Sequence, residues 1–276
     1  MKPLTGATRT IDVVRVRGRQ RSRGADHAAA EEPLEIRLHG RAFAVIMRTP
    51  GADRDLAAGF LLAERVIRTA DDLGTIEYCT DPEVASGHAS NVLNVRLADP
   101  SRVDALFAER RNILTNSSCG LCGRTTIDSL SADVEPIRVT PRLEAASLAK
   151  CAARLRAAQS VFDETGGLHA AGLFTAEAEL LDVAEDVGRH NAVDKVIGRQ
   201  VMRDALPLSD AVLFVSGRTS YEIVQKALYG GIGIVASVSA PSSLAIELAE
   251  AMGMTLVGFV RGDSFNIYTN PERIQE

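Results

Sequence analysis

The chain has 276 residues, of which 46% are hydrophobic and 24% charged, as in ordinary globular proteins with one large or two modest domains. Its 31 basic and 36 acidic side chains give a net charge of −5, which argues against broad nucleic-acid binding but leaves room for a local anion site. With only 4 cysteines, no secretory segment and no long apolar run, we expect a cytoplasmic protein without a disulfide framework that binds neither nucleic acid nor membrane.

Residues 1–30 are rich in arginine, which alternates with other residues between Arg15 and Arg23. Such a basic segment is typical of a solvated arm. Valine and isoleucine in its first half favour a strand, and we expect Arg19 to Ala30 to be a flexible linker.

A small α+β domain is expected over residues 31–115. Leu34, Ile36 and Leu38 alternate with charged residues, and the turn that follows at Gly40 predicts a β-hairpin. The other elements expected here are, in order, a helix capped by Asp53, strands over 75–79 and 92–97, and a helix capped by Ser101.

Residues 116–124 read Asn-Ser-Ser-Cys-Gly-Leu-Cys-Gly-Arg. The two thiols, Cys119 and Cys122, stand three positions apart among small and polar residues that favour an exposed, mobile loop. A helix capped by Thr125 would place both sulfurs near its N-terminus, where the partial positive charge favours the thiolate. We therefore predict a reactive thiol that carries a disulfide, a metal or a terminal sulfur atom.

Other interpretations of this pair stay open. A structural zinc site needs four ligands, and the only other cysteines, Cys79 and Cys151, stand alone in apolar surroundings, so we expect no structural zinc. A thioredoxin-type dithiol would follow a buried strand, for which residues 110–115 are a weak candidate. Two inert cysteines in a glycine-rich loop are the third possibility.

Residues 125–276 have the pattern of an α/β domain. Helices are expected over 143–158, 192–202, 221–229 and 244–252, and strands over 172–175, 180–185, 211–215, 232–238, 255–260 and 265–268. Successive β-α-β units predict a mainly parallel or mixed sheet with helices on both faces, a three-layer α/β/α architecture.

Three polar turns, at Ser216, Ser239 and Arg261, follow strands of this sheet and should therefore lie at one edge. Their serines, backbone N–H groups and the arginines Arg218 and Arg261 predict a phosphate or pyrophosphate site.

Two histidines accompany these turns. The lone His169 favours a core histidine with its hydrogen bonds satisfied. His190 lies in the strand-to-helix joint from Asp186 to Asn191, together with Arg189, and this joint fits a ligand site and a capping network equally well.

With these residues in view, the sequence resembles the formate dehydrogenase accessory sulfurtransferase (FdhD) family. The resemblance extends from Pro33 to Ile274 and depends on five segments together, which are 117–123, 165–171, 185–195, 239–243 and 258–262.

The resemblance implies a cytoplasmic homodimer with a cytidine-deaminase-like fold. In this family a cysteine desulfurase supplies persulfide sulfur, which passes to the molybdenum bis(molybdopterin guanine dinucleotide) cofactor of formate dehydrogenase. Cys119 matches the sulfur-carrying position and Cys122 its companion. Phe259, Val260, Arg261, Gly262, Asp263 and Ser264 match the segment that binds the cofactor, which is a bound substrate that a guanine nucleotide partly mimics.

The sequence also bears on two other functions. A zinc deaminase needs His-x-Glu followed by Pro-Cys-x-x-Cys, whereas His169 is followed by two alanines and the cysteine pair precedes it, so deaminase chemistry is not expected. A non-catalytic chaperone that only holds the cofactor remains the alternative.

Overall fold

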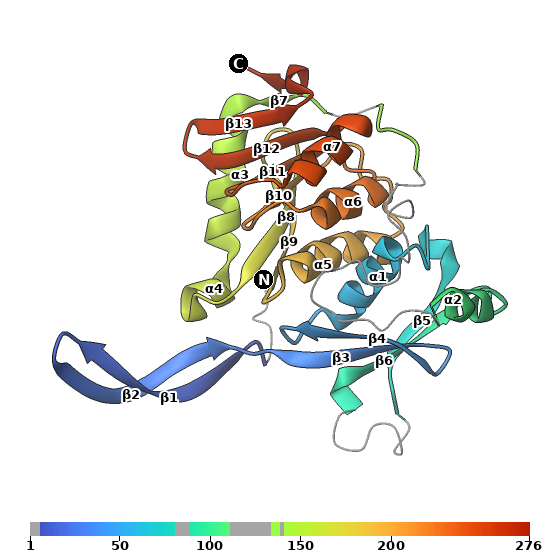
Figure 1. The fold of residues 1–276 in the computed structure, drawn as a ribbon, viewed down its shortest axis with the longest axis horizontal. Coiled ribbons are helices and arrows are strands. Elements are labelled where there is room, and N and C mark those ends of the chain that lie inside the picture. The colour runs from blue at the N-terminus through green and yellow to red at the C-terminus, as the bar shows by residue number, and fades with distance from the viewer. Residues whose placement is uncertain (1–5, 81–88, 111–133, 139–140) are drawn as a thin grey trace.

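The computed structural model describes residues 6–80, 89–110, 134–138 and 141–276 (Figure 1). A six-stranded sheet in this part of the chain has the order β13-β12-β11-β10-β8-β9. Its strands are β8 (His169–Phe174), β9 (Leu180–Asp186), β10 (Val212–Val215), β11 (Ile234–Ser237), β12 (Thr255–Arg261) and β13 (Ser264–Thr269). Strands β10, β11 and β12 are parallel, and their flanking neighbours pair antiparallel, so the sheet is mixed as expected.

Helices cover both faces of this sheet, which confirms the three-layer architecture (Figure 1). On one face, α3 (Ala145–Ala158) places Leu148, Cys151 and Leu155 against Phe174 and Phe214. On the other face lie α5 (Arg189–Met202), α6 (Tyr221–Tyr229) and α7 (Ser243–Ala251). All four residues of β10 are buried because both faces are covered, and this explains its uninterrupted apolar sequence.

The N-terminal half contains a second sheet with the order β4-β3-β6-β5. Its strands are β3 (Glu32–Leu38), β4 (Arg41–Arg48), β5 (Leu73–Tyr78) and β6 (Val92–Leu97), and its helices are α1 (Asp53–Ala63) and α2 (Arg102–Arg110). Short elements complete the chain: η1 (Ala70–Asp72), η2 (Ala89–Asn91), α4 (Ser160–Thr165), η4 (Pro271–Arg273) and the paired β7 (Leu143–Glu144) and β14 (Ile274–Gln275).

Two glycines let α1 and α5 cross at backbone contact distance. A Cβ atom at Gly59 would lie 2.0 Å from the carbonyl oxygen of Asp194, and one at Gly198 would lie 1.9 Å from that of Asp55. No side chain can occupy these positions, so the helices pack closely and a single hydrophobic core runs from the N-terminal sheet into the larger one.

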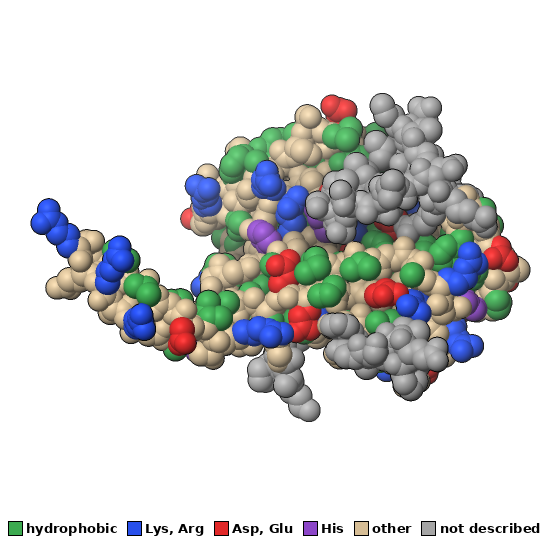
Figure 2. Space-filling model, turned by 60° about the horizontal axis from the view of Figure 1, so that its bottom comes forward, with side chains coloured by type: hydrophobic (Ala, Val, Ile, Leu, Met, Phe, Trp, Pro, Cys, Tyr) green, Lys and Arg blue, Asp and Glu red, His purple; other side chains and the backbone are tan. Residues whose placement is uncertain are grey.

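The arginine-rich segment forms an antiparallel hairpin of β1 (Thr8–Arg17) and β2 (Gln20–Ala29), which projects from the body (Figures 1 and 2). The expected linker over Arg19–Ala30 is therefore wrong, since most of it is strand. Gly18, with φ 61°, makes the turn that returns the chain, and backbone pairing to β1 orders a sequence of low strand propensity. Within the described residues, no helix is long and apolar enough to cross a membrane.

Candidate functional site

The predicted reactive thiols, Cys119 and Cys122, lie outside the described residues, as does Thr125. The other two cysteines are free thiols, Cys79 half-buried and Cys151 buried on α3. Burial raises the pKa of Cys151 to about 12, so this thiol stays protonated at neutral pH and is a poor nucleophile.

The three polar turns lie at one edge of the large sheet, as predicted, because β10, β11 and β12 run parallel. Strand β8 runs antiparallel to β10 and β9 antiparallel to β8, so the start of β8 and the end of β9 reach the same edge. His169 and Asp186, which are paired across these strands, therefore join the turns there.

Backbone hydrogen bonds connect the turns into one surface. Thr219 N–H donates to the Ala240 carbonyl at 3.2 Å, and Ser242 N–H donates to the Thr219 carbonyl at 3.0 Å. Phe259 N–H donates to the Ser239 carbonyl at 3.1 Å, which attaches the end of β12 to the same ladder. The residues expected to bind the cofactor thus lie on adjoining turns.

The expected cofactor segment, Phe259 to Ser264, is the end of β12, a tight turn and the start of β13. Arg261 pairs with Ser264 across the turn, where Gly262 has φ 56°. Phe259 is 38% exposed, and the residues from Arg261 to Ser264 are exposed as well, so their side chains are open to a ligand. Val260 is only 2% exposed and packs in the core on the α3 face, so its side chain supports the segment.

Arg189, Arg218 and His169 form a basic cluster at this edge. A Cβ atom at Gly217 would lie 3.2 Å from His169 Nδ1 and 3.5 Å from Arg189 Cδ, so glycine leaves the space that brings these side chains together. Burial lowers the pKa of His169, and the positive charges of Arg189, His190 and Arg218 lower it further. At neutral pH the imidazole is therefore uncharged while the two guanidinium groups are charged.

The acids nearest this cluster are already paired. Asp186 forms an ion pair with Lys195 at 2.6 Å, and the Glu222 carboxylate lies 2.8 Å from His190 Nε2. Burial opposes ionisation of Glu222, but the hydrogen bonds from His190 and Ser220 outweigh it and lower its pKa.

Positive charge is consequently left unneutralised at the edge. Among the described residues, the side chains of Arg189 and Arg218 have no ion-pair or hydrogen-bond partner, and Arg189 Nε is buried without one. Helices α5 and α6 begin here, and their N-caps, Gly188 and Ser220, make no capping hydrogen bond through a side chain. Unpaired cations beside two helix N-termini favour an anion.

The joint between β9 and α5 combines both roles considered for it. Asp186 orders the chain just before α5, since it accepts hydrogen bonds from Gly188 N–H at 2.8 Å and from the Asn191 side-chain Nδ2 at 2.9 Å, although it does not cap the first helical turn itself. Arg189 remains available to a ligand. The expectation of a satisfied core histidine at His169 is wrong, because its half-buried ring has no hydrogen-bond partner among the described residues.

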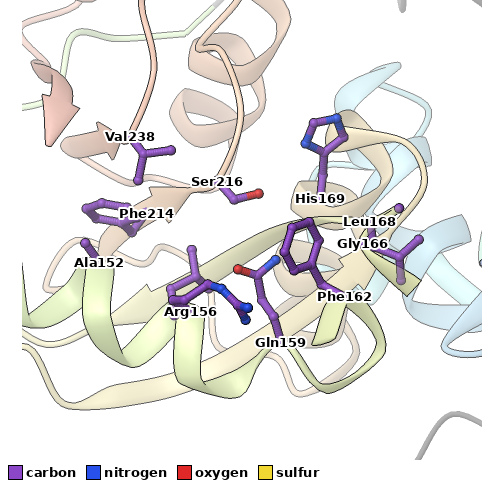
Figure 3. A pocket seen from close by; sticks show the side chains of 12 residues that line it. Ala152, Arg156, Gln159, Phe162, Gly166, Leu168, His169, Phe214, Ser216 and Val238 are labelled. Carbon is purple, nitrogen blue, oxygen red and sulfur yellow. The ribbon is translucent and has the colours of Figure 1, made fainter. Parts of the chain in front are cut away.

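A pocket of about 410 Å³ opens beside the cluster, between α3, α4 and the ends of β8 and β10 (Figure 3). Its lining comprises Ala152, Leu155, Arg156, Gln159, Phe162, Gly166, Gly167, Leu168, His169, Phe214, Ser216 and Val238. Sequence analysis singled out the segment around His169 and missed Gln159 and Phe162. No motif marks them, because the pocket exists only once helices and strands distant in sequence have packed.

Comparison with known proteins shows the family to which the chain belongs. Residues 29–275 match the model of the FdhD/NarQ family, and the chain belongs to this family. It is 51% identical to the sulfur carrier protein FdhD of Streptomyces coelicolor, over 95% of this chain and 94% of that one.

Less similar proteins also match over nearly the whole chain. The chain is 44% identical to the sulfur carrier protein FdhD of Sulfolobus acidocaldarius, over 96% of this chain and 98% of that one. Its fold is similar to the crystal structure of a candidate formate dehydrogenase accessory protein from Desulfotalea psychrophila, with a TM-score of 0.76, 25% identity, and coverage of 98% of this chain and 100% of that one.

Proposed function

We propose that this protein is a sulfur carrier that enables formate dehydrogenase activity, acting as a cytoplasmic homodimer. Its membership of the FdhD/NarQ family and its relatives named sulfur carrier protein FdhD support this role. The observation that carries the proposal furthest is the basic cluster of Arg189 and Arg218 at the sheet edge, because it suits the pyrophosphate groups of a dinucleotide cofactor.

Sulfur is acquired by thiol exchange. The Cys119 thiolate attacks the outer sulfur of a persulfide on a cysteine desulfurase, and the S–S bond of the donor breaks. The desulfurase cysteine leaves as a thiolate, and Cys119 carries the persulfide. This transfer of sulfur needs no external oxidant or reductant, because one persulfide is converted into another.

The acceptor is molybdenum bis(molybdopterin guanine dinucleotide), which the protein binds as a substrate. Each dinucleotide contains a pyrophosphate, and two arginines without acidic partners, with two helix N-termini beside them, fit such a group. Exposed groups of the segment from Phe259 to Ser264 extend the same surface.

Release of sulfur at the oxidation level of sulfide requires two electrons. Attack of the Cys122 thiolate on Cys119 supplies them, since it expels hydrosulfide and leaves a disulfide between the two residues. A cellular thiol reductant then restores both thiols. In this scheme Cys119 holds the sulfur and Cys122 drives its release.

Mass spectrometry of the purified protein, after incubation with a cysteine desulfurase and cysteine, tests the proposal. We expect an added mass of one sulfur atom on the peptide that contains Cys119, removable by a thiol reductant. Absence of added sulfur on that peptide, under conditions in which the desulfurase itself becomes persulfidated, would contradict the carrier role.

A further inference from the structure

The pocket beside the basic cluster has the shape and lining of a small-molecule site. Its volume of about 410 Å³ falls within the range of about 300–1,000 Å³ that is usual for such sites. Leu168, Phe162 and Phe214 provide apolar walls, and polar groups enter from only a few positions (Figure 3). Leu155 adds to the apolar lining. This combination is typical of a pocket that encloses a ring and orients it by hydrogen bonds.

Gln159 is the polar group that distinguishes this pocket from an ordinary packing gap. It lies at the joint of α3 and α4, is 4% exposed, and points its side-chain amide into the space near Phe162 (Figure 3). The backbone is satisfied, since Gln159 N–H donates to the Arg156 carbonyl and the Gln159 carbonyl accepts from Asp163 N–H. The side-chain amide has no hydrogen-bond partner in the described part of the chain. An amide withdrawn from bulk water in this way favours a ligand that supplies a donor and an acceptor.

The residues around Gln159 hold the pocket wall in place. The Arg156 guanidinium lies 4.9 Å from the centroid of the Phe162 ring and forms an ion pair with Asp163 at 2.5 Å. Val161 N–H and Phe162 N–H donate to the Glu185 carboxylate at 3.0 and 2.8 Å, which attaches the start of α4 to β9. Phe162 therefore offers a fixed aromatic surface to a flat ligand.

One end of the pocket is shared with the basic cluster. His169 and Ser216 line the pocket, and His169 is also the side chain that meets Arg189 across Gly217. A ligand whose ring enters the pocket can thus direct an attached anionic group to Arg189 and Arg218.

We propose that this pocket binds a flat heterocycle with a lactam edge, an adjacent ring N–H and C=O, and that the Gln159 amide pairs with this edge. The proposal rests on the proposed function and deepens it by assigning the ring of the bound cofactor to a site that the predicted Phe259–Ser264 segment does not include. The Gln159 side chain offers an N–H donor and a carbonyl acceptor side by side, which complement a lactam through two hydrogen bonds. Guanine and pterin rings both carry this edge, and a molybdopterin dinucleotide contains both.

Three probes separate the parts of the site in calorimetric titrations of the full-length protein. Guanosine diphosphate carries ring and anion, inorganic pyrophosphate carries the anion alone, and neopterin carries a pterin ring without phosphate. Gln159→Met keeps the length of the side chain and removes its hydrogen bonds. If guanine occupies the pocket, we expect this variant to bind guanosine diphosphate roughly tenfold more weakly than the wild type does; if the pterin occupies it, we expect the same loss for neopterin. In both cases its affinity for pyrophosphate should equal that of the wild type.

Gln200→Met is the matched control. Gln200 is also buried and donates a hydrogen bond to Asp182, but it does not line the pocket, so its loss should leave all three affinities unchanged. Thermal melting of both variants checks that they are folded. If neopterin and guanosine diphosphate compete and Gln159→Met weakens the binding of both, the pterin is an occupant of the pocket. If the substitution weakens the binding of guanosine diphosphate alone, the occupant is guanine.

Wild-type affinity of folded Gln159→Met for guanosine diphosphate and neopterin would overturn the pocket assignment. The assignment would also be overturned if the wild-type protein bound guanosine diphosphate no more tightly than pyrophosphate and did not bind neopterin. Neither result would contradict the anion site. Failure of the wild-type protein to bind either phosphate-containing probe would instead contradict the cofactor-binding part of the proposed function, and the ring assignment with it.

Discussion

Lys195 Nζ lies 2.6 Å from Asp186 Oδ2, and the two side chains are 1% and 0% exposed. The pair connects α5 to the end of β9 and also to the N-terminal unit, since Asp186 accepts a hydrogen bond from Thr49 N–H and Lys195 donates one to the Thr49 carbonyl. Arg189 and His190 lie three and four positions after Asp186, at the start of α5, so this buried pair holds in place the joint that carries Arg189 of the basic cluster.

Replacing Lys195 with methionine should destabilise the protein by about 3–5 kcal/mol, because the Asp186 carboxylate would remain buried without its counter-charge. Urea denaturation followed by circular dichroism measures this. Asp104→Asn, which breaks the exposed pair with Arg41, is the control and should change the free energy of unfolding by at most about 1 kcal/mol. Similar effects of the two substitutions would show that the buried pair has no special structural role.

Arg218→Ala and Arg261→Ala should each weaken binding of guanosine diphosphate about ten- to hundredfold, because a charge-assisted hydrogen bond to a phosphate is only partly replaced by water. Calorimetry with the purified variants measures the effect. Arg138 is an exposed arginine outside the sheet edge, and Arg138→Ala should bind as the wild type does. An unchanged affinity in either edge variant would remove that residue from the site.

Anion binding should strengthen as the pH falls. Burial and the charges of Arg189, His190 and Arg218 lower the pKa of His169 below its ordinary value of 6.5, with only Asp186 acting in the opposite direction. A bound anion raises the pKa of His169, so anion binding is accompanied by proton uptake. Affinity therefore rises as the pH falls through the pKa of His169 in the complex, and it levels off below the pKa of His169 in the free protein.

His169→Gln isolates this contribution from the titration of the ligand's own phosphate. Between pH 8 and pH 5.5 the wild type should gain about three- to tenfold more affinity for guanosine diphosphate than the variant does. Parallel pH profiles for the two proteins would exclude His169 from the anion site.

Thiols used for transfer need no structural metal. Protein purified under reducing conditions should therefore contain no stoichiometric zinc, and a chelator should not lower its melting temperature. Stoichiometric zinc bound by thiolates would instead indicate that Cys119 and Cys122 are ligands of a structural zinc ion.

The elements with the clearest patterns were predictable. The strand over 92–97 and the helix over 221–229 were predicted at their observed bounds, since alternation in one and a buried face in the other are strong signals. The same holds for the edge at which Ser216 and Ser239 lie, because parallel strands bring their ends together.

Features that depend on distant partners could not be predicted. Strand β2 has arginines, a glycine and a histidine, and only its pairing with β1 gives it extended structure. Asp53 was expected to cap α1, but Ala52 is the N-cap, and the Asp53 carboxylate instead pairs with the buried Arg48 at 2.8 Å. Gln159 likewise becomes notable only when the pocket around it has formed.

The central claim is that Cys119 carries sulfur, and the most direct test is formate dehydrogenase activity in cells whose only copy of the gene encodes Cys119→Ser at wild-type level. We predict loss of activity with retained fold and guanosine diphosphate binding, because a hydroxyl group cannot hold a persulfide, while Cys122→Ser should cause a more variable deficit. Normal formate dehydrogenase activity with Cys119→Ser would contradict the carrier mechanism and favour a chaperone that only holds the cofactor.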